Sequence, residues 1–384
     1  MKGLKGITDY QVVVLGPRAS GKTVYLACLY GQYSKPDGHL ILDCEDPGKV
    51  VQLTNTYQEV VEALTWPTPN EIGAVDEFHF ICTAQTDRQS YRGFGLTYFD
   101  YAGERLEKNI APSVTLEPSQ QFRLALTNSD AVVGLIDGAD IVDLIQSKGA
   151  LKTEVDKKYV NILKLVAAYT RNKPVHFLLT KWDLFERNGI ELPTVVNSLM
   201  QLDEMGDHFR SWKARGIPLR LIPVSAVGKS FAKPIDKGNR EMQKTGEPLS
   251  QENLIVPIAC ALYDELRLAL EESRDAFVKK LPRFRRGVLK GRPVIEAVKK
   301  ANVRKYVTPV ILGAPIDPFQ KGLALGLVYL TEVGKNAACQ KLLNSRDFAN
   351  YIAAEYREGM AYIATDLLDR VGQFDAQFPA NRLA

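Results

Sequence analysis

Four runs along the chain are almost continuously apolar, rather than apolar at every second position. They are YQVVVLG at 10–16, AVVGLID at 131–137, VHFLLT at 175–180 and LRLIPVS at 219–225. Such runs are typical of parallel strands in a sheet that is covered on both faces. Two further segments are predicted to pair as strands in the same sheet, EFHFICTA at 77–84 and GLTYFD at 95–100.

Helical patterns separate these strands. They are predicted near residues 21–33, 150–171, 191–213 and 254–272. In the last of them Ile258, Leu262 and Leu266 recur every four residues after Pro257, which suits a first helical turn. The alternation predicts an α/β fold with a doubly wound, mostly parallel six-stranded sheet, in which five strands are parallel and one is antiparallel. Ligands of such sheets bind at the carboxyl ends of the strands.

The composition is that of an ordinary globular protein, with 384 residues of which 45% are hydrophobic and 24% charged. This length predicts one large domain and one smaller one, which we place at 8–275 and 276–384, the second being a basic, mainly helical region. The five cysteines are scattered and form no CxxC pair, which favours reduced thiols over disulfides or a zinc site. The four histidines are equally scattered and suggest no metal cluster.

The first ten residues, MKGLKGITDY, lack the apolar core of a secretion signal. No apolar run reaches the length needed to cross a membrane. We therefore expect a cytoplasmic protein without a transmembrane segment.

The stretch GPRASGKT at 16–23 lies between the first predicted strand and the first predicted helix. Glycines at both ends of such a loop let its backbone N–H groups turn toward phosphate oxygens, and the helix N-terminus adds a partial positive charge. The lysine would reach the β- and γ-phosphates, and the threonine would bind Mg²⁺. The predicted phosphate-binding residues are Gly16, Ser20, Gly21, Lys22 and Thr23. The alternative is a chance match in a turn between a strand and a helix.

Three later tetrapeptides also end predicted strands. In DYAG at 100–103, Asp100 would hold the water shell of the magnesium ion, and the Gly103 N–H would contact the γ-phosphate. In TKWD and SAVG the predicted base-binding residues are Thr180, Lys181, Asp183, Ser225 and Ala226. The Asp183 carboxylate can accept hydrogen bonds from guanine N1–H and N2–H₂, which adenine does not offer. The Lys181 stem would cover the ring, and the Ala226 N–H would meet guanine O6.

Together these motifs resemble those of the translation-factor and Ras-like (TRAFAC) class of P-loop GTPases, over roughly residues 8–275. The chain is most similar to the bacterial double-GTPase proteins in Arg18 of the loop, in DYAGE, in TWPTP at 65–69, and in a polar insert after SAVG followed by ENLIVP. The resemblance implies Mg²⁺-dependent hydrolysis of GTP to GDP and phosphate as a conformational switch. It also implies a multi-component bacterial system, such as anti-phage defence, and a second protein as partner, either another GTPase or an activating protein.

The segment between Lys22 and Asp100 is longer than one helix, one loop and two strands require. We therefore expect an enlarged first switch region, in which one threonine completes the magnesium site and senses the γ-phosphate. We assign Thr68, because it lies in a Pro-bounded loop before the second predicted strand. Thr54, Thr56 and Thr65 are the alternatives. The same loop would also suit a rigid surface turn with Trp66 in the core.

The catalytic groups are left open by the sequence. Glu104 follows the DYAG glycine, where small GTPases have a glutamine that orients the attacking water. A carboxylate beside phosphates is repelled unless a cation neutralises it. Arg18 would either stabilise charge on the transferred phosphoryl group, or pair with Glu104, or stay solvated at the loop tip. The candidate catalytic residues are thus Arg18, Lys22, Thr68 and Glu104.

The remaining region, 276–384, carries no motif of this kind. Its basic residues gather at 279–305, which would suit nucleic acid, an anionic membrane surface or an acidic partner, or simply a solvated face. Farther on, a long amphipathic helix is predicted from Phe348, Tyr351, Ile352, Tyr356, Met360, Ile363, Leu367 and Val371. It would either pack against the first domain or dock a partner.

Two other functions remain open from the sequence. The first is a scaffold that binds GTP or GDP and hydrolyses little, because of Glu104. The second is a nucleic-acid-associated GTPase that acts through residues 279–305, for which binding would depend steeply on salt.

Overall fold

The structure is a computed structural model of the whole chain. The residues that it describes are 9–17, 19–35, 40–67, 75–85, 90–102, 120–169, 173–235, 242–264, 366–367 and 369–383.

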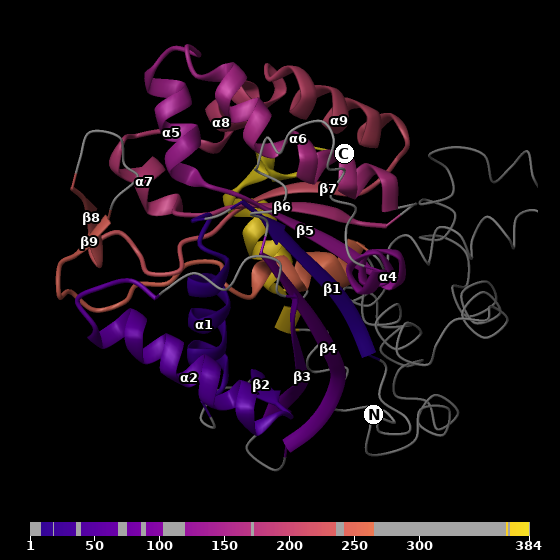
Figure 1. The fold of residues 1–384 in the computed structure, drawn as a ribbon, viewed down its shortest axis with the longest axis vertical. Helices are drawn as coiled ribbons and strands as arrows, with labels where there is room; N and C mark the ends of the chain where they lie inside the picture. Colours follow the sequence, from indigo (N-terminus) through magenta and orange to yellow (C-terminus); the bar gives the residue numbers. More distant parts are fainter. Residues whose placement is uncertain are drawn as a thin grey trace, which may run out of the picture.

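A seven-stranded sheet forms the centre of the molecule, with helices on both faces (Figure 1). Its strand order is β2-β3-β4-β1-β5-β6-β7. The strands are β1 (Asp9–Gly16), β2 (Leu40–Cys44), β3 (Val75–Gln85), β4 (Ser90–Ala102), β5 (Ala131–Ile136), β6 (Val175–Leu179) and β7 (Leu219–Pro223). Strand β3 is antiparallel to both of its neighbours, β2 and β4, and the other adjacent strands are paired in parallel, so the sheet is mostly parallel. The prediction of an α/β fold is confirmed, but the predicted number of six strands is wrong.

The helices that connect the strands range from 6 residues in α7 to 18 residues in α6. They are α1 (Lys22–Tyr33), α2 (Pro47–Glu62), α4 (Gln120–Asn128), α5 (Gly138–Gln146), α6 (Lys152–Tyr169), α7 (Trp182–Arg187), α8 (Leu192–Met200) and α9 (Asp203–Ala214). A further helical segment covers 256–264. The single helix predicted at 191–213 is two helices, because the chain turns at Gln201 and Leu202 between α8 and α9.

The missing strand and a missing helix both lie in the long segment before β3. In β2 the three residues Leu40, Ile41 and Leu42 are buried, but so short an apolar run carries a weak signal. Helix α2 begins after Asp46, whose side chain accepts a hydrogen bond from Gly48 N at 2.7 Å. An Asp before a Pro is a helix-start signal that the sequence offered. The extra length of this segment is therefore partly regular structure.

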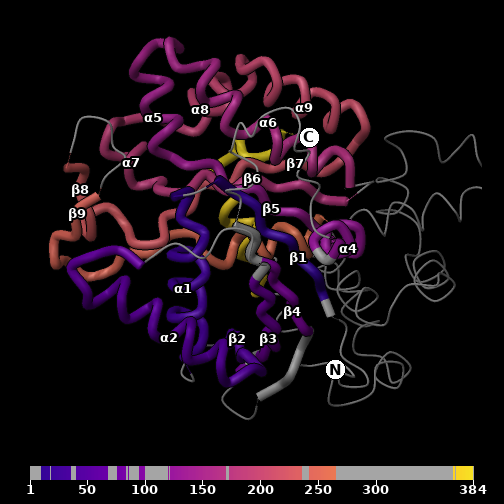
Figure 2. Tube along the Cα trace, viewed as in Figure 1, coloured from indigo at the N-terminus to yellow at the C-terminus, as the bar shows by residue number. Residues whose placement is uncertain are grey.

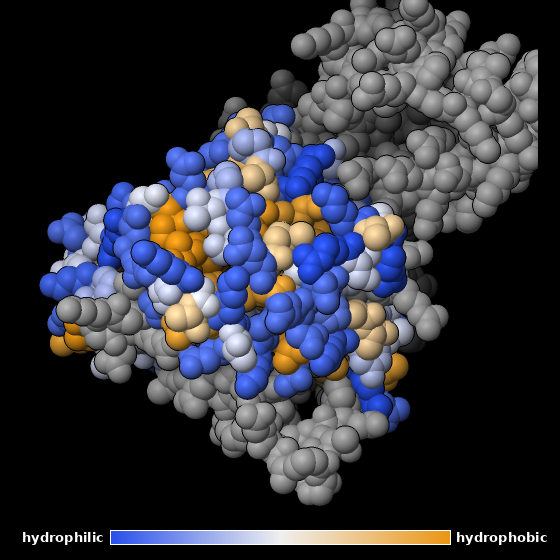
Figure 3. All heavy atoms as spheres, turned by 90° about the horizontal axis from the view of Figure 1, so that it is seen from above, coloured by the Kyte–Doolittle hydropathy of each residue, from blue (hydrophilic) through white to orange (hydrophobic). Residues whose placement is uncertain are grey.

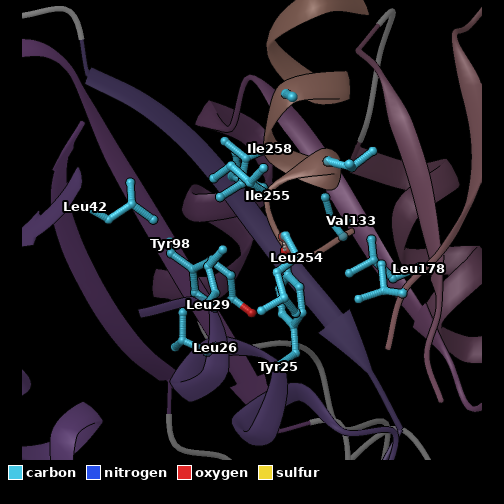
Figure 4. Close-up of a cluster of buried hydrophobic side chains, with 14 of the residues drawn as sticks. Tyr25, Leu26, Leu29, Leu42, Tyr98, Val133, Leu178, Leu254, Ile255 and Ile258 are labelled. Atoms are coloured by element: carbon cyan, nitrogen blue, oxygen red, sulfur yellow. Dashed lines mark hydrogen bonds between the residues drawn. The ribbon is translucent and has the colours of Figure 1, made fainter. Parts of the chain in front are cut away.

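The alternation along β1 shows how the sheet is covered. Val12 and Val14 lie in one apolar cluster with side chains of α1, α2 and 256–264. Val13 and Leu15 lie in a second cluster with side chains of α4 to α9. Figure 4 shows part of the first cluster, where Tyr25 of α1 lies near Leu254 and donates from its hydroxyl to the Leu254 carbonyl at 2.9 Å. Burial on both faces explains why the central strands are apolar at nearly every position.

The last described residues pack into the same unit as the sheet. Leu367, Val371 and Phe374 are buried in the cluster that contains α1. The Leu383 N–H donates to the Leu219 carbonyl of β7 at 2.9 Å, and Figure 2 shows this end of the chain beside β6 and β7. For residues 366–367 and 369–371 of the predicted amphipathic helix, these contacts agree with the alternative in which the helix packs against the first domain. The proposed domain boundary falls within 265–365, outside the described residues.

The described surface seen from above in Figure 3 is mostly hydrophilic, with smaller hydrophobic areas between the polar side chains. Within the described ranges, no helix combines the length and the apolar character that crossing a membrane requires.

Candidate nucleotide-binding site

The loop at 16–23 connects β1 to α1, as predicted, and all its residues except Arg18 are described. Two of its residues have left-handed backbone, Ala19 with φ 61° and Gly21 with φ 88°. The Ser20 hydroxyl donates to the Pro17 carbonyl at 2.8 Å and so holds the loop closed. A Cβ atom at Gly16 would lie 2.7 Å from Ser20 Oγ, so the tight packing of this loop requires glycine there.

The loop presents the groups that a phosphate needs. Gly21 precedes α1 and no side chain caps this helix, so the positive end of the helix dipole faces the loop and would attract an anion. Lys22 Nζ donates to the Gly16 carbonyl at 2.7 Å and to the Pro17 carbonyl at 2.9 Å. A positive charge is thereby held against the loop backbone, where an incoming phosphate would lie.

The candidate magnesium ligands are placed only in part. Thr23 lies in the first turn of α1. Asp100 pairs in parallel register with Val14, two residues before the end of β1, which brings the end of β4 beside the start of the loop. The side chain of Asp100 lies outside the described part, as do Thr68, Gly103 and Glu104.

The donor set suits a magnesium ion that is shared with phosphates. Mg²⁺ is commonly bound by one or two protein oxygens together with substrate phosphates and waters. In the described part of the chain, no three His, Cys, Asp or Glu side chains are grouped as metal ligands. Thr23 at the start of α1 and Asp100 near the end of β4 are residue types that such a shared ion accepts.

The TKWD and SAVG segments meet at the ends of β6 and β7. Ser225 Oγ donates to Asp183 Oδ1 at 2.8 Å and accepts from the Gly228 N–H at 3.0 Å. The Trp182 N–H donates to the Val224 carbonyl at 3.1 Å. The structure therefore brings Asp183 and Ser225 together, and Ala226 follows directly. Their roles toward a base stay predictions.

Asp183 is almost fully buried, with 3% of its surface exposed. Burial raises the pKa of its carboxyl group, and the hydrogen bond from Ser225 partly opposes that rise. A buried carboxylate with one oxygen engaged favours further N–H donors at the other. Guanine N1–H and N2–H₂ are donors of this kind.

Asp137 is a residue of this region that sequence reasoning missed. It follows β5, and its two carboxylate oxygens lie 2.8 and 3.0 Å from Lys181 Nζ. Its Oδ1 also accepts from the Ala139 N–H at 3.0 Å and so caps α5. The only available signal was its position at the end of a buried strand, the same position that singled out Asp100 and Asp183.

The polar insert after SAVG reaches the end of α2. Within it, β8 (Ala232–Pro234) pairs with β9 (Met242–Lys244). Lys244 Nζ donates to the carbonyls of Glu59, Ala63 and Thr65 at 2.6, 2.8 and 2.8 Å.

Trp66 is anchored by the same insert. Its Nε1–H donates to the Met242 carbonyl at 2.6 Å, and its ring packs against the core. The alternative of a turn with Trp66 in the core therefore agrees with the structure up to Pro67. Residues 68–74, which contain the candidate Thr68, lie outside the described part.

Two further predicted regions also fall outside what the structure describes. They are Arg18 in the loop and the basic stretch at 279–305. No protein-family profile matches the chain, and a search of curated proteins finds no significant match.

Proposed function

We propose that this protein binds Mg²⁺-GTP and hydrolyses it to GDP and phosphate as a conformational switch. One observation carries the proposal. The loop at 16–23, residues 180–183 and residues 225–228 all follow parallel strands and so lie at the same edge of the sheet. This edge is where doubly wound sheets bind ligands. The first loop offers groups for phosphates, and the other two hold a buried carboxylate suited to guanine.

Each residue has a defined task in this proposal. Lys22 would exchange the neutral carbonyls of Gly16 and Pro17 for the charged β- and γ-phosphate oxygens, because an anion attracts an ammonium group more strongly. Thr23, Asp100 and Thr68 would hold Mg²⁺ directly or through water. When bound, the ion would neutralise charge on the phosphates.

Hydrolysis requires water to attack the γ-phosphorus while the bond from that phosphorus to the β–γ bridging oxygen breaks, which yields GDP and inorganic phosphate. Glu104 and Arg18 remain the proposed groups for orienting this water and stabilising the developing charge. A carboxylate suits the first task poorly beside phosphates, so we propose slow hydrolysis that a second protein accelerates. GTP and reduced thiols both belong to the cytoplasm, where we place a multi-component bacterial system.

The test begins with the phosphate groups. Lys22→Ala is expected to lower affinity for GDP and GTP by at least about 100-fold, because the ammonium group that we assign to the β- and γ-phosphates is lost. Thr23→Ala is expected to weaken only the part of the affinity that depends on Mg²⁺. Isothermal titration calorimetry with and without Mg²⁺ measures both, and release of γ-³²P-phosphate measures turnover.

Lys157→Ala is the matched control, since Lys157 is an exposed lysine on α6. We expect it to bind GDP as the natural protein does. Equal affinities for the natural protein, Lys22→Ala and Thr23→Ala would rule out a phosphate site at residues 16–23.

A further inference from the structure

We propose that Asp137 and Gly138 form a preshaped support for the base-binding loop, and that Asp137 is a positioning residue for Lys181. The inference rests on the proposed function, because it assigns the ligand of residues 180–183 as a guanine nucleotide. It concerns two residues of the β5–α5 connection that no motif in the sequence identified.

The support begins with the backbone. Thr180 lies beside the end of β5, where both its N–H and its Oγ1–H donate to the Ile136 carbonyl, at 3.0 and 3.1 Å. A Cβ atom at Gly138 would lie only 2.2 Å from the Thr180 carbonyl oxygen and 3.2 Å from that of Lys181. Glycine at 138 therefore lets α5 approach the loop directly.

The second element is the side chain of Asp137. Lys181 has a left-handed backbone, with φ 54°, which disfavours any residue with a Cβ atom. The bond from its ammonium group to both Asp137 oxygens compensates for this conformation. The Lys181 side chain is 23% exposed and that of Asp137 is 7% exposed. The pair therefore lies between the core and the surface at which we propose that the ligand binds.

The backbone of Asp137 is held in turn by hydrogen bonds that involve Tyr159 of α6 and Asp140 of α5. The Tyr159 hydroxyl accepts from the Asp137 N–H at 2.8 Å and donates to Asp140 Oδ2 at 2.9 Å. Lys158 Nζ lies 2.6 Å from the same Asp140 oxygen. Because Tyr159 is fully buried, the backbone at residue 137 is fixed before any ligand arrives.

The pair also has an electrostatic consequence for base recognition. Lys181 and Asp183 are two residues apart, and a free ammonium group at 181 would be drawn to the Asp183 carboxylate. Asp137 engages that ammonium group instead. Asp183, which already accepts from Ser225, then keeps its second oxygen for the base, and the Lys181 stem is held where it would cover the ring. A loop that is already held in place loses less conformational entropy when the nucleotide binds, so this support increases the affinity for GDP.

The experiment is a double-mutant cycle read by GDP affinity. Asp137→Asn keeps the carbonyl oxygen that caps α5 but removes the charge opposite Lys181. We expect affinity for GDP to fall about tenfold, within the range for residues in direct contact. In a Lys181→Met background, the same substitution should change GDP affinity less than twofold.

Asp366→Asn is the matched control. It removes the charge from a partly buried ion pair, that with Arg370, whose two residues have no part in the support or in the proposed site. GDP affinity should stay within about twofold of that of the natural protein, even where thermal stability falls.

Each other outcome overturns the inference. If Asp137→Asn binds GDP as tightly as the natural protein, the proposed function stands and the role of Asp137 is wrong. If it loses the same factor in the Lys181→Met background, the effect of Asp137 on GDP affinity does not act through Lys181, and the positioning role is wrong. If the natural protein does not bind GDP, the proposed function and this inference both fail.

Discussion

Arg220→Met is expected to lower the free energy of unfolding by roughly 3–5 kcal/mol, the usual cost of removing one partner from a buried ion pair. Arg220 lies in β7 with 1% of its surface exposed. Its guanidinium group donates to both oxygens of Asp264 at 2.5 and 3.2 Å, and to Asp375 at 2.7 Å. Methionine of similar length leaves the buried Asp264 carboxylate without its cation, whereas Asp375 keeps its ion pair with Arg382.

Arg220→Met should also weaken the packing of the C-terminal residues against the sheet. Asp264 precedes the residues outside the described part and Asp375 follows them, so one arginine joins both flanks to the sheet. Denaturant unfolding followed by circular dichroism measures the free energy. Arg210→Met is the control, because the Arg210–Asp207 pair is exposed and should contribute less than about 1 kcal/mol. Equal effects of the two substitutions would show that the buried cluster does not stabilise the fold.

A second measurement follows the neighbouring His176, whose Nε2 lies 3.6 Å from Asp264 Oδ2. Burial lowers the pKa of His176 to about 4, the charge of Asp264 opposes this effect, and the charge of Arg220 adds to it. In a folded Arg220→Met protein the pKa of His176 should therefore rise. Histidine NMR signals across a pH titration report this change even where stability is reduced.

Asp183→Asn is expected to lower GDP affinity by at least about 100-fold, because a site built for a particular base edge rejects a ligand that leaves its polar groups unpaired. The side chain is buried, and its Oδ1 already accepts from Ser225. An amide at 183 presents a donor where guanine also presents donors. Xanthine nucleotides carry an oxygen at C2 that can accept from this amide, so the preference should move toward XDP.

Competition binding with GDP, XDP and ATP measures the change. Glu186→Gln is the control, since it makes the same chemical change at an exposed position of α7. Its preference for GDP should be unaltered. If ATP competes equally with GDP for the natural protein, the assignment of residues 180–183 to guanine is wrong.

Prediction from sequence succeeded best where the signal is local. Continuous apolar runs identified β1, β5, β6 and β7 to within two residues at each end. It failed for β2, which is short, and for the break between α8 and α9, where no Gly or Pro marks the turn. For the candidate site, it placed four motifs at strand ends. The structure agrees for GPRASGKT, TKWD and SAVG, and it describes DYAG as far as Ala102, at the end of β4.

By itself, the sequence determined the α/β class, the glycine-rich loop between the first strand and the first helix, and the strand ends that carry polar residues. Hydrophobic periodicity and glycine spacing are read over a few neighbouring residues. The tertiary structure alone decided that Asp137 meets Lys181 and that Asp264 and Asp375 share Arg220. These pairs join residues far apart in the chain, and the register of β5, β6 and β7 together with the packing against them determines which charges become buried partners.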